Sequence, residues 1–320
     1  MHPILYLSRC DLRLSRSVGA LCHAAEVRLL LDARPTVQQA VDAVRAALAG
    51  GLDPDQDPPR SVVPVPTGQF LLMPAFWDRY AGVKVASVAP GNPARGLPRI
   101  QGHYLLMDGP TLTPMALLDG VALTSVRTAA VSAVAADLLA VPDAERLVVF
   151  GTGPQAQSHI EALCAVRPVR DVVVVGRNPE RTQALAAQYP FARAGTPDDV
   201  SAADLVACCT SSRVPVFDGA KVPEHATVVA VGSHEPEARE VDDVLIGRST
   251  VVVEGIGAAT REAGDVVLAI KSGVLAADDL VSLAALARGF AVSPGPRLFK
   301  SVGMAWEDLV VAATAYEAAE

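Results

Sequence analysis

The stretch that decides the fold is LVVFGTGPQAQSHIEAL, residues 147–163. Its apolar run at 147–150 predicts a buried strand, and a helical pattern follows the glycine-containing turn. The turn has the G-x-G-x-x-A spacing of dinucleotide-binding proteins. In such a turn the backbone approaches a pyrophosphate, and the helix N-terminus directs free N–H groups at it. The motif therefore predicts cofactor contacts from Gly151, Thr152, Gly153, Pro154 and Gln155.

A second strand is predicted at 172–175, where four valines lead into Gly176, Arg177 and Asn178. In sites that bind NAD, an acidic residue near this strand tip holds the ribose 2′-hydroxyl. Here Arg177 stands at the tip and Arg181 follows one helical turn later, which favours the 2′-phosphate of NADPH over NADH. The alternative is that Arg177 is a solvated loop charge. We predict NADPH as the cofactor, with contacts from Arg177, Asn178 and Arg181.

The composition restricts the functional class. The chain has 320 residues, of which 51% are hydrophobic and 19% charged, and this predicts a compact globular protein. A net charge of −8 argues against nucleic acid and anionic membranes as partners. The pattern predicts no transmembrane segment and no signal peptide, so we expect a cytoplasmic protein. The 5 cysteines and 6 histidines lack ligand spacing, which predicts reduced thiols and no metal site.

The N-terminal half predicts a mixed or antiparallel sheet domain. A strand is expected at 4–7, a helical segment within 11–30, and an amphipathic helix at 37–48. Five short strand candidates follow, separated by Gly, Pro, Asn and Asp turns, at 61–65, 69–73, 83–88, 102–107 and 113–118. A long, Ala-rich and buried helix at 124–139 connects this half to the next.

From residue 145 strands and helices alternate, which is typical of a doubly wound parallel sheet. An amphipathic helix is expected from Trp306 onward. The predicted fold class is α/β, with a Rossmann-type parallel sheet domain and a mixed α+β domain. The predicted elements of the parallel domain are 147–150, 155–166, 172–175, 179–188, 204–209, 227–231 and 249–253.

Three cations in the N-terminal half are candidates for binding a carboxylate, namely Arg60, Lys84 and Arg127. Lys84 is flanked by valines in a strand, so its side chain is either solvated or directed into a pocket. Cations that converge in a cleft hold a carboxylate, and arginine does so through two parallel hydrogen bonds. The alternative is three surface charges.

His234 is the candidate proton-transferring residue. It lies in VGSHEP, directly after a predicted strand of the parallel sheet, and ligands bind at the carboxyl ends of such strands. There an imidazole can titrate beside both nicotinamide and substrate. The alternative is an ordinary loop histidine.

Together these segments resemble the ornithine cyclodeaminase / mu-crystallin family over nearly the whole chain. The RTAA-containing helix and the FKSVG segment are specific to that family, whereas the glycine turn is not. The matching pieces are PPRS at 58–61, MPAF at 73–76, GVKVASVAPGN at 82–92, GLPRIQG at 96–102, LLDGVALTSVRTAAVSAVAADLLA at 117–140, GTGPQAQ at 151–157, DLVACCTSS at 204–212, VGSHEPEARE at 231–240 and FKSVGMAWEDL at 299–309.

The resemblance implies a homodimer with two domains per chain. It implies a substrate-binding and dimerisation domain at 1–125 and 297–320, and a Rossmann domain at 126–296. It places the substrate carboxylate on the three cations, with Lys84 and His234 as the catalytic residues. It also implies cofactor contacts from Thr210, Val231, Gly232, Val302 and Gly303.

Departures from the family pattern favour one activity. The cyclodeaminases carry an aspartate at the position of His234 and an acid at that of Arg177, and a histidine in this context resembles the reductases of cyclic imino acids. Arg99 stands where Thr is common, and 11–30 is longer than usual. We predict an enzyme, an NADPH-dependent reductase of 1-pyrroline-2-carboxylate or 1-piperideine-2-carboxylate. The alternatives are an L-amino-acid dehydrogenase, the cyclodeaminase itself, and a cofactor-bound small-molecule-binding protein without turnover.

Overall fold

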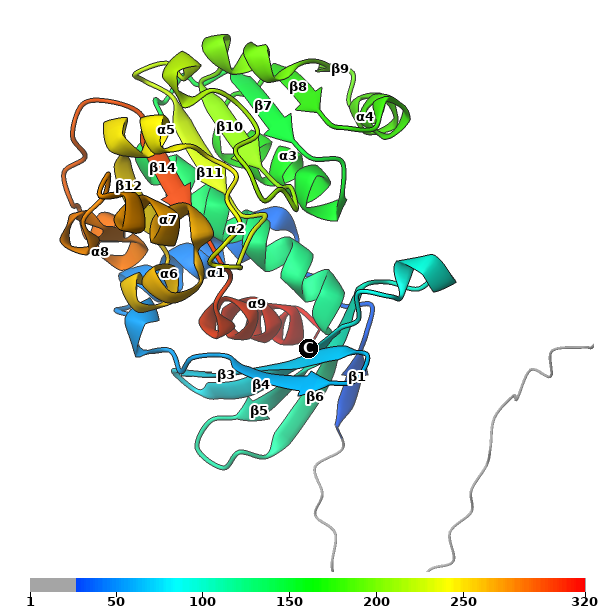
Figure 1. Ribbon diagram of the computed structural model, residues 1–320. Helices are drawn as coiled ribbons and strands as arrows, with labels where there is room; N and C mark the ends of the chain where they lie inside the picture. Colours follow the sequence, from blue (N-terminus) through cyan, green and yellow to red (C-terminus); the bar gives the residue numbers. More distant parts are fainter. Residues whose placement is uncertain (1–26, 320) are drawn as a thin grey trace, which may run out of the picture.

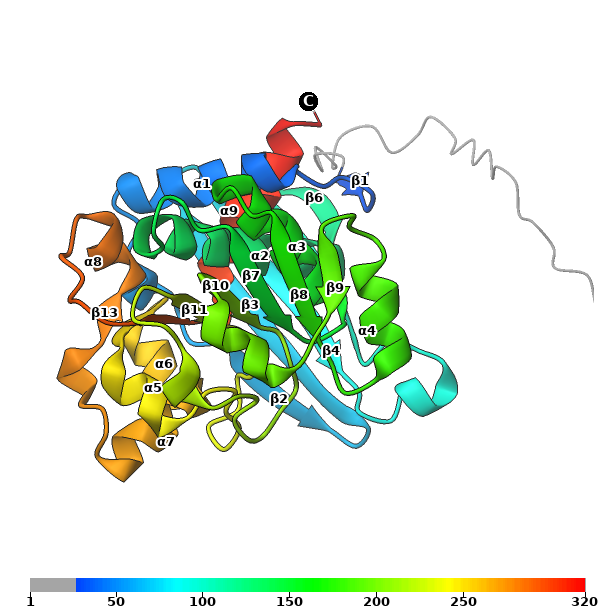
Figure 2. The same ribbon diagram turned by 90° about the horizontal axis from the view of Figure 1, so that it is seen from above.

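The computed structural model describes residues 27–319 and arranges them in two sheets with helices between and around them (Figure 1). Seen from above, the parallel sheet lies over the mostly antiparallel one (Figure 2). The strand predicted at 4–7 lies outside the described residues, as does most of 11–30. The described end of that segment is strand β1, so the helix predicted there is wrong over Arg28–Leu30.

The smaller sheet has six strands in the order β1-β6-β5-β4-β3-β2. Its pairs are antiparallel except β1 with β6, which confirms the predicted mixed sheet. One face packs on α9, and no described helix lies on the other face in Figure 1. The strands are β1 Arg28–Leu30, β2 Ser61–Val65, β3 Gly68–Trp77, β4 Tyr80–Val88, β5 Ile100–Asp108 and β6 Pro114–Asp119.

The larger sheet has eight strands, all parallel, in the order β13-β12-β14-β11-β10-β7-β8-β9. Strand order reverses around β7 and β10, and a doubly wound sheet binds its ligand at such a switch point. The strands are β7 Arg146–Phe150, β8 Asp171–Val175, β9 Ala192–Ala194, β10 Leu205–Cys208, β11 Thr227–Ala230, β12 Thr250–Val253, β13 Val281–Ser282 and β14 Arg297–Lys300.

The structure confirms the helices that the sequence predicted from a strong hydrophobic periodicity. Helix α1 begins at a capping box between Thr36 and Gln39, and α2 begins where Asp119 accepts the N–H groups of Val121 and Ala122. The α-helices are α1 Val37–Ala49, α2 Gly120–Leu139, α3 Pro154–Val166, α4 Pro179–Ala186, α5 Asp243–Arg248, α6 Ile256–Glu262, α7 Gly264–Ser272, α8 Leu283–Ala287 and α9 Ala305–Glu317.

Helix α2 is long and apolar enough to span a membrane, although the sequence pattern predicted no transmembrane segment. Within residues 27–319 it is the one helix with the length and hydropathy to cross a membrane. It nevertheless packs against α1, α3 and α9, and 61% of its most apolar window is buried inside the protein. Its hydrophobic character is therefore that of a central core helix.

Helix α9 is not amphipathic as predicted. Both of its acidic residues in the first turn, Glu307 and Asp308, are 0% exposed. The sequence predicted that these two acids lie on a solvent-exposed polar face of the helix, because carboxylates are rarely buried without partners. Here α9 lies between the six-stranded sheet and α2, and the buried acids meet buried cations.

One predicted domain boundary falls inside a helix, and the other falls at the start of a strand. The boundary at 125/126 lies within α2, which touches both sheets. The boundary at 297 is wrong for 297–300, because β14 pairs with β11 and β12 in the parallel sheet. Only α9 returns to the six-stranded sheet.

Candidate functional site

The glycine turn after β7 has the geometry that a dinucleotide requires. Gly151 has a φ of 116°, and a Cβ there would lie 2.5 Å from the carbonyl oxygen of Cys209. A Cβ on Gly153 would meet nothing within 4 Å, so the backbone faces open space at the start of α3. The third small residue, Ala156, is 0% exposed, so α3 packs closely on the sheet. The turn can therefore hold a pyrophosphate at the helix N-terminus.

A cavity of about 770 Å³ extends from this turn along the ends of β8, β10 and β11. Pro154, Val302 and Gly303 do not line it: Pro154 occupies the first position of α3, and Val302 and Gly303 lie near Arg60. The predicted cofactor residues that line it are Gly151, Thr152, Gly153, Gln155, Arg177, Asn178, Arg181, Thr210, Val231 and Gly232.

The far end of this cavity is cationic. The side chains of Arg177 and Arg181 are exposed and form no hydrogen bond or ion pair within residues 27–319. Asn178 is partly occupied, because its side chain accepts the N–H of Arg181 and caps α4. No aspartate or glutamate is among the described residues that line the cavity. Two free guanidinium groups without a competing acid suit a phosphate.

Glu240 organises the other end of the cavity, and the sequence did not identify it. Its carboxylate accepts the backbone N–H of Thr210, the hydroxyl of Thr210 and the N–H of Gly232, each at 2.7 Å. The carboxylate thereby ties the ends of β10 and β11 together. Glu240 is 0% exposed, and desolvation raises its pKa while Lys300 opposes the rise. An acid ten residues beyond the end of β11 gives no sequence signal for this role.

A second cavity, of about 920 Å³, adjoins the first, because Ser211, Ser212 and Gly232 line both. Arg60 and His234 line it, whereas Lys84 and Arg127 do not. Its apolar wall comes from the six-stranded sheet and its polar wall from the segment after β11. The two cavities therefore meet where the nicotinamide end of a dinucleotide and a substrate would come together.

Arg60 connects the second cavity with the segment after β14. Its Nε lies 2.8 Å from Glu262, and its Nη2 donates to the carbonyl oxygens of Val302 and Gly303 at 3.0 and 2.7 Å. No described residue bonds its Nη1. That nitrogen remains available to a carboxylate in the cavity.

His234 faces the same cavity, as predicted. Its pKa is lowered from the usual 6.5, first because the walls of the cavity desolvate the ring and then because of the charge on Arg60. The imidazole is consequently neutral at pH 7. A neutral ring can orient a proton or a water, and it donates a proton less readily than the sequence reasoning assumed.

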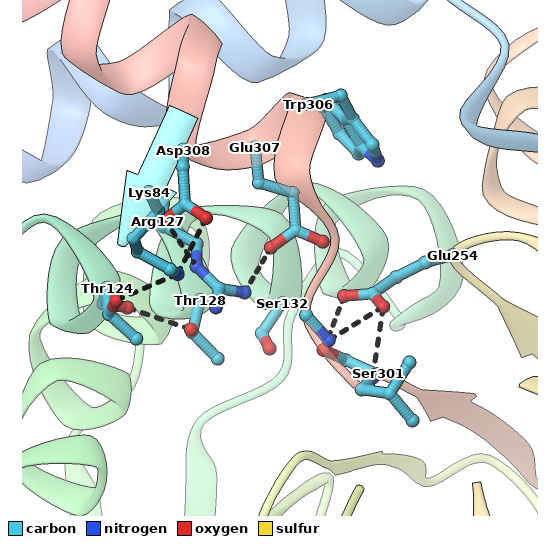
Figure 3. A network of polar contacts seen from close by, with 12 residues as sticks. Lys84, Thr124, Arg127, Thr128, Ser132, Glu254, Ser301, Trp306, Glu307 and Asp308 are labelled. Atoms are coloured by element: carbon cyan, nitrogen blue, oxygen red, sulfur yellow. Dashed lines mark hydrogen bonds and ion pairs between the residues drawn. The ribbon is translucent and has the colours of Figure 1, made fainter. Parts of the chain in front are cut away.

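Lys84 and Arg127 converge, but on acids of α9 rather than in an open cavity (Figure 3). The Lys84 Nζ lies 2.6 Å from Asp308 and 3.1 Å from the hydroxyl of Thr124. Arg127 pairs with Glu307, and its Nε lies 3.3 Å from Asp308. The two cations are only 4% and 5% exposed. They are neither surface charges nor a free clamp, and pattern reasoning could not foresee this because it assigned the acids of α9 to solvent.

Burial shifts the pKa values of these side chains. Desolvation lowers the pKa of Lys84 to about 8, although Asp308 opposes the change. Desolvation also raises the pKa of Glu307 well above its usual value, and the nearby Glu254 raises it further. Arg127 stays charged, because Glu307 and Asp308 outweigh the effect of burial and raise its pKa. We call Lys84, Arg127, Glu254, Glu307 and Asp308 the buried charge cluster.

Gly303 joins this cluster to the second cavity. It has a φ of 76°, and a Cβ there would collide with the guanidinium of Arg127. Its carbonyl bonds Arg60 and its N–H donates to Glu254 at 3.0 Å. Two of the predicted carboxylate binders thus adjoin one glycine, with Arg60 on the side of the open cavity, while Lys84 is held by Asp308.

The comparisons with known proteins agree with this architecture. Residues 20–320 match the model of the ornithine cyclodeaminase/mu-crystallin family. The chain belongs to that family. A Delta(1)-pyrroline-2-carboxylate/Delta(1)-piperideine-2-carboxylate reductase of Azospirillum brasilense is 36% identical over 270 residues, 82% of this chain and 84% of the relative.

Two solved structures share the fold. One is the Delta(1)-pyrroline-2-carboxylate reductase of Thermococcus litoralis in complex with NADH and L-proline, with a TM-score of 0.83 and 28% identity over 92% of this chain and 97% of that chain. The other is an archaeal alanine dehydrogenase dimer with bound NAD, with a TM-score of 0.84 and 26% identity over 92% and 95% of the two chains. The predicted family and the predicted fold class are confirmed.

Proposed function

We propose that this protein is an NADPH-dependent reductase of a cyclic ketimine, 1-pyrroline-2-carboxylate or 1-piperideine-2-carboxylate, and forms the L-imino acid. The observation that carries the proposal is the junction of the two cavities at Ser211, Ser212 and Gly232. A dinucleotide cavity and a cation-lined cavity meet there, in a chain whose relatives include reductases of both substrates.

The residues around the first cavity suit NADPH. When bound, NADPH supplies a hydride from its nicotinamide ring. The glycine turn holds the pyrophosphate, and Arg177 and Arg181 hold the 2′-phosphate. Thr210 and Gly232, fixed by Glu240, form the wall beside the nicotinamide. The finer choice of NADPH over NADH rests on the two free arginines.

The residues around the second cavity bind and orient the substrate. Arg60 binds the carboxylate through its free Nη1, and the buried Lys84 and Arg127 add positive charge from outside the cavity. Hydride adds to C2 of the protonated imine, the C=N π electrons become the nitrogen lone pair, and the resulting amine takes a proton from solvent. His234 is neutral and orients the imine N–H or its water.

We also propose that two copies pair through the uncovered face of the six-stranded sheet. Three apolar side chains on this face are exposed, namely Phe70 at 43%, Phe76 at 65% and Val85 at 44%. Along strands β3 and β4 they alternate with buried residues that belong to the opposite face of the sheet. An exposed apolar sheet face of this kind is typical of an interface. The archaeal alanine dehydrogenase neighbour is a dimer. Light scattering should give a dimer mass for the wild type and a monomer mass for Phe76→Glu/Val85→Glu; a monomeric wild type contradicts this proposal.

A nicotinamide absorbance assay distinguishes the candidate functions. The purified protein should consume NADPH with 1-pyrroline-2-carboxylate or 1-piperideine-2-carboxylate. Formation of NADPH from NADP⁺ with L-alanine, but no reduction of either imine, would identify an open-chain dehydrogenase instead. Release of ammonia from L-ornithine without net change in absorbance would identify a cyclodeaminase. Inactivity in all three assays would leave a binding protein.

A further inference from the structure

Arg99 is the arginine of the second cavity that has no partner. Three other arginines line this cavity, and each is paired with a glutamate: Arg60 and Arg261 with Glu262, and Arg213 with Glu235. The side chain of Arg99 forms no hydrogen bond or ion pair within residues 27–319. A charge that lines a cavity without a counter-ion is available to a ligand.

The backbone fixes where this charge lies. The carbonyl of Arg99 accepts the N–H of Ala89 at 2.8 Å, which continues the pairing of Val88 with Ile100. Arg99 therefore stands at the last rung of the β4–β5 ladder rather than at a free loop tip. The adjoining wall is apolar and consists of Val62, Leu71, Val88 and Ile100.

The charge balance and size of the cavity favour an acidic substrate. Four arginines and three glutamates line it, and His234 is neutral, so the walls carry an excess of one positive charge. A ring that fits against the apolar wall, with its C2 carboxylate near Arg60, leaves much of the 920 Å³ unfilled. Arg99 lines this cavity together with Arg60.

We propose that Arg99 binds a second carboxylate of the substrate, so that the preferred substrate is a cyclic ketimine dicarboxylate. This inference rests on the proposed reductase function. Arg60 binds the carboxylate on the imine carbon, and Arg99 binds the distal carboxylate through two parallel hydrogen bonds. Arg99 is exposed and stays hydrated when a monocarboxylate binds, so the discrimination comes from the charge-assisted hydrogen bonds that only the second carboxylate can accept.

A competing role for Arg99 involves Glu237. Glu237 also lines the cavity and has no hydrogen bond or ion pair within residues 27–319. If Arg99 and Glu237 form an ion pair when the cavity closes, Arg99 acts as a latch: it stabilises the closed cavity and does not contact the substrate. Arg95 is a matched control, because it lies in the same connection as Arg99, at the end of the 3-10 turn Pro93–Arg95, and does not line the cavity.

The kinetic test compares 1-piperideine-2-carboxylate with 1-piperideine-2,6-dicarboxylate, which differ only in the second carboxylate. The wild type should have the higher kcat/KM for the dicarboxylate. Arg99→Gln should lower kcat/KM for the dicarboxylate about 10- to 100-fold and for the monocarboxylate less than about twofold. Arg99→Lys should recover part of the loss, and Arg95→Gln should match the wild type. Equal effects of Arg99→Gln on both substrates, reproduced by Glu237→Gln, identify a latch and overturn the proposal.

A binding test keeps the inference separate from the proposed function. Pyridine-2,6-dicarboxylate and pyridine-2-carboxylate are stable ring acids, and calorimetry measures their binding without turnover. The wild type should bind the diacid more tightly, and Arg99→Gln should remove the difference. Equal binding of both acids by the wild type overturns the role of Arg99 even if the enzyme reduces imines. Failure to reduce any imine overturns the reductase, while the calorimetric preference still tests Arg99. Weaker NADPH binding by Arg99→Gln, with unchanged acid binding, assigns Arg99 to the cofactor and also overturns the proposal.

Discussion

Raising the pH above 8 should weaken binding of the substrate carboxylate, because Lys84 loses its proton there. Its pKa lies near 8 since the ammonium is desolvated at 4% exposure, and this outweighs the attraction of Asp308 at 2.6 Å. A shift from 10.5 to about 8 corresponds to roughly 3 kcal/mol against the charged form. The buried charge cluster thus loses a cation within an accessible pH range.

The expected loss of carboxylate affinity follows from the release of a single proton by Lys84. If only charged Lys84 supports carboxylate binding, affinity should fall about tenfold per pH unit above 8. Stability changes in the opposite direction. Between pH 8 and 10.5 the unfolded chain binds more protons at this site than the folded one, so the contribution of Lys84 to stability rises with pH there.

The assay must separate Lys84 from the imine, which also titrates. Pyrrole-2-carboxylate has a carboxylate but no basic nitrogen, so the pH dependence of its inhibition constant against 1-pyrroline-2-carboxylate reports a group of the enzyme. The wild type should lose inhibitor affinity above pH 8. Lys84→Arg stays charged and should keep its affinity to higher pH, whereas Lys84→Met should bind weakly at every pH.

The outcome that refutes this reasoning is an alkaline loss of inhibitor affinity that is the same in Lys84→Arg and the wild type. The titrating group would then be another residue, and the buried charge cluster would serve stability alone. Thermal unfolding provides an independent readout, because Lys84→Met should lack the rise in stability between pH 8 and 10.5.

Three further variants test other parts of the site. Arg177→Asp should weaken NADPH binding about 10- to 100-fold and leave NADH nearly unchanged, as measured by fluorescence titration; equal effects on both cofactors would contradict a 2′-phosphate contact. His234→Ala should lower kcat/KM by up to about 10²-fold, because the ring that orients the imine N–H or its water is lost, and it should lose any wild-type titration below pH 6.5; an unchanged kcat/KM would make His234 a wall residue. Asp57 has a pKa of about 7, raised by burial above 3.8, so the folded protein binds more protons and stability should fall as pH rises from 4 to 7. Asp57→Asn keeps an acceptor for the N–H of Trp306 and should flatten that dependence of Tm; a slope equal to wild type would assign it to other groups.

The sequence predicted the fold well where local patterns were strong. The valine-rich strands, the glycine turn and α1 lie within a few residues of their predicted bounds, because hydrophobic period and turn residues determine them locally. The sequence did not predict strand β14. This strand has only four residues, RLFK, and it pairs with β11 and β12, which are distant from it in the sequence. Nothing within that segment specifies partners more than 40 residues away.

The site was predicted less completely, because its key contacts are non-local. The motif located the cofactor cavity, since the glycine turn and the ends of three further strands build it. The acids that hold Lys84 and Arg127 lie some 180 to 224 residues beyond them on α9. Glu254 and Glu240 likewise act on backbone N–H groups of other segments. Which carboxylates are buried depends on packing that periodicity cannot reveal.

The segment 301–303 is held from both sheets. Glu254, at the end of β12, accepts the N–H groups of Val302 and Gly303, while Arg60 binds the carbonyl groups of the same two residues. The parallel sheet therefore holds one side of this segment and the six-stranded sheet the other. Arg127 lies against Gly303, and any side chain there would displace its guanidinium. Gly303 therefore lies between two arginines: its carbonyl accepts from Arg60, and the guanidinium of Arg127 occupies the place of a Cβ. A side chain at position 303 should consequently disturb both arginines, because the glycine leaves room for Arg127 and its carbonyl accepts from Arg60.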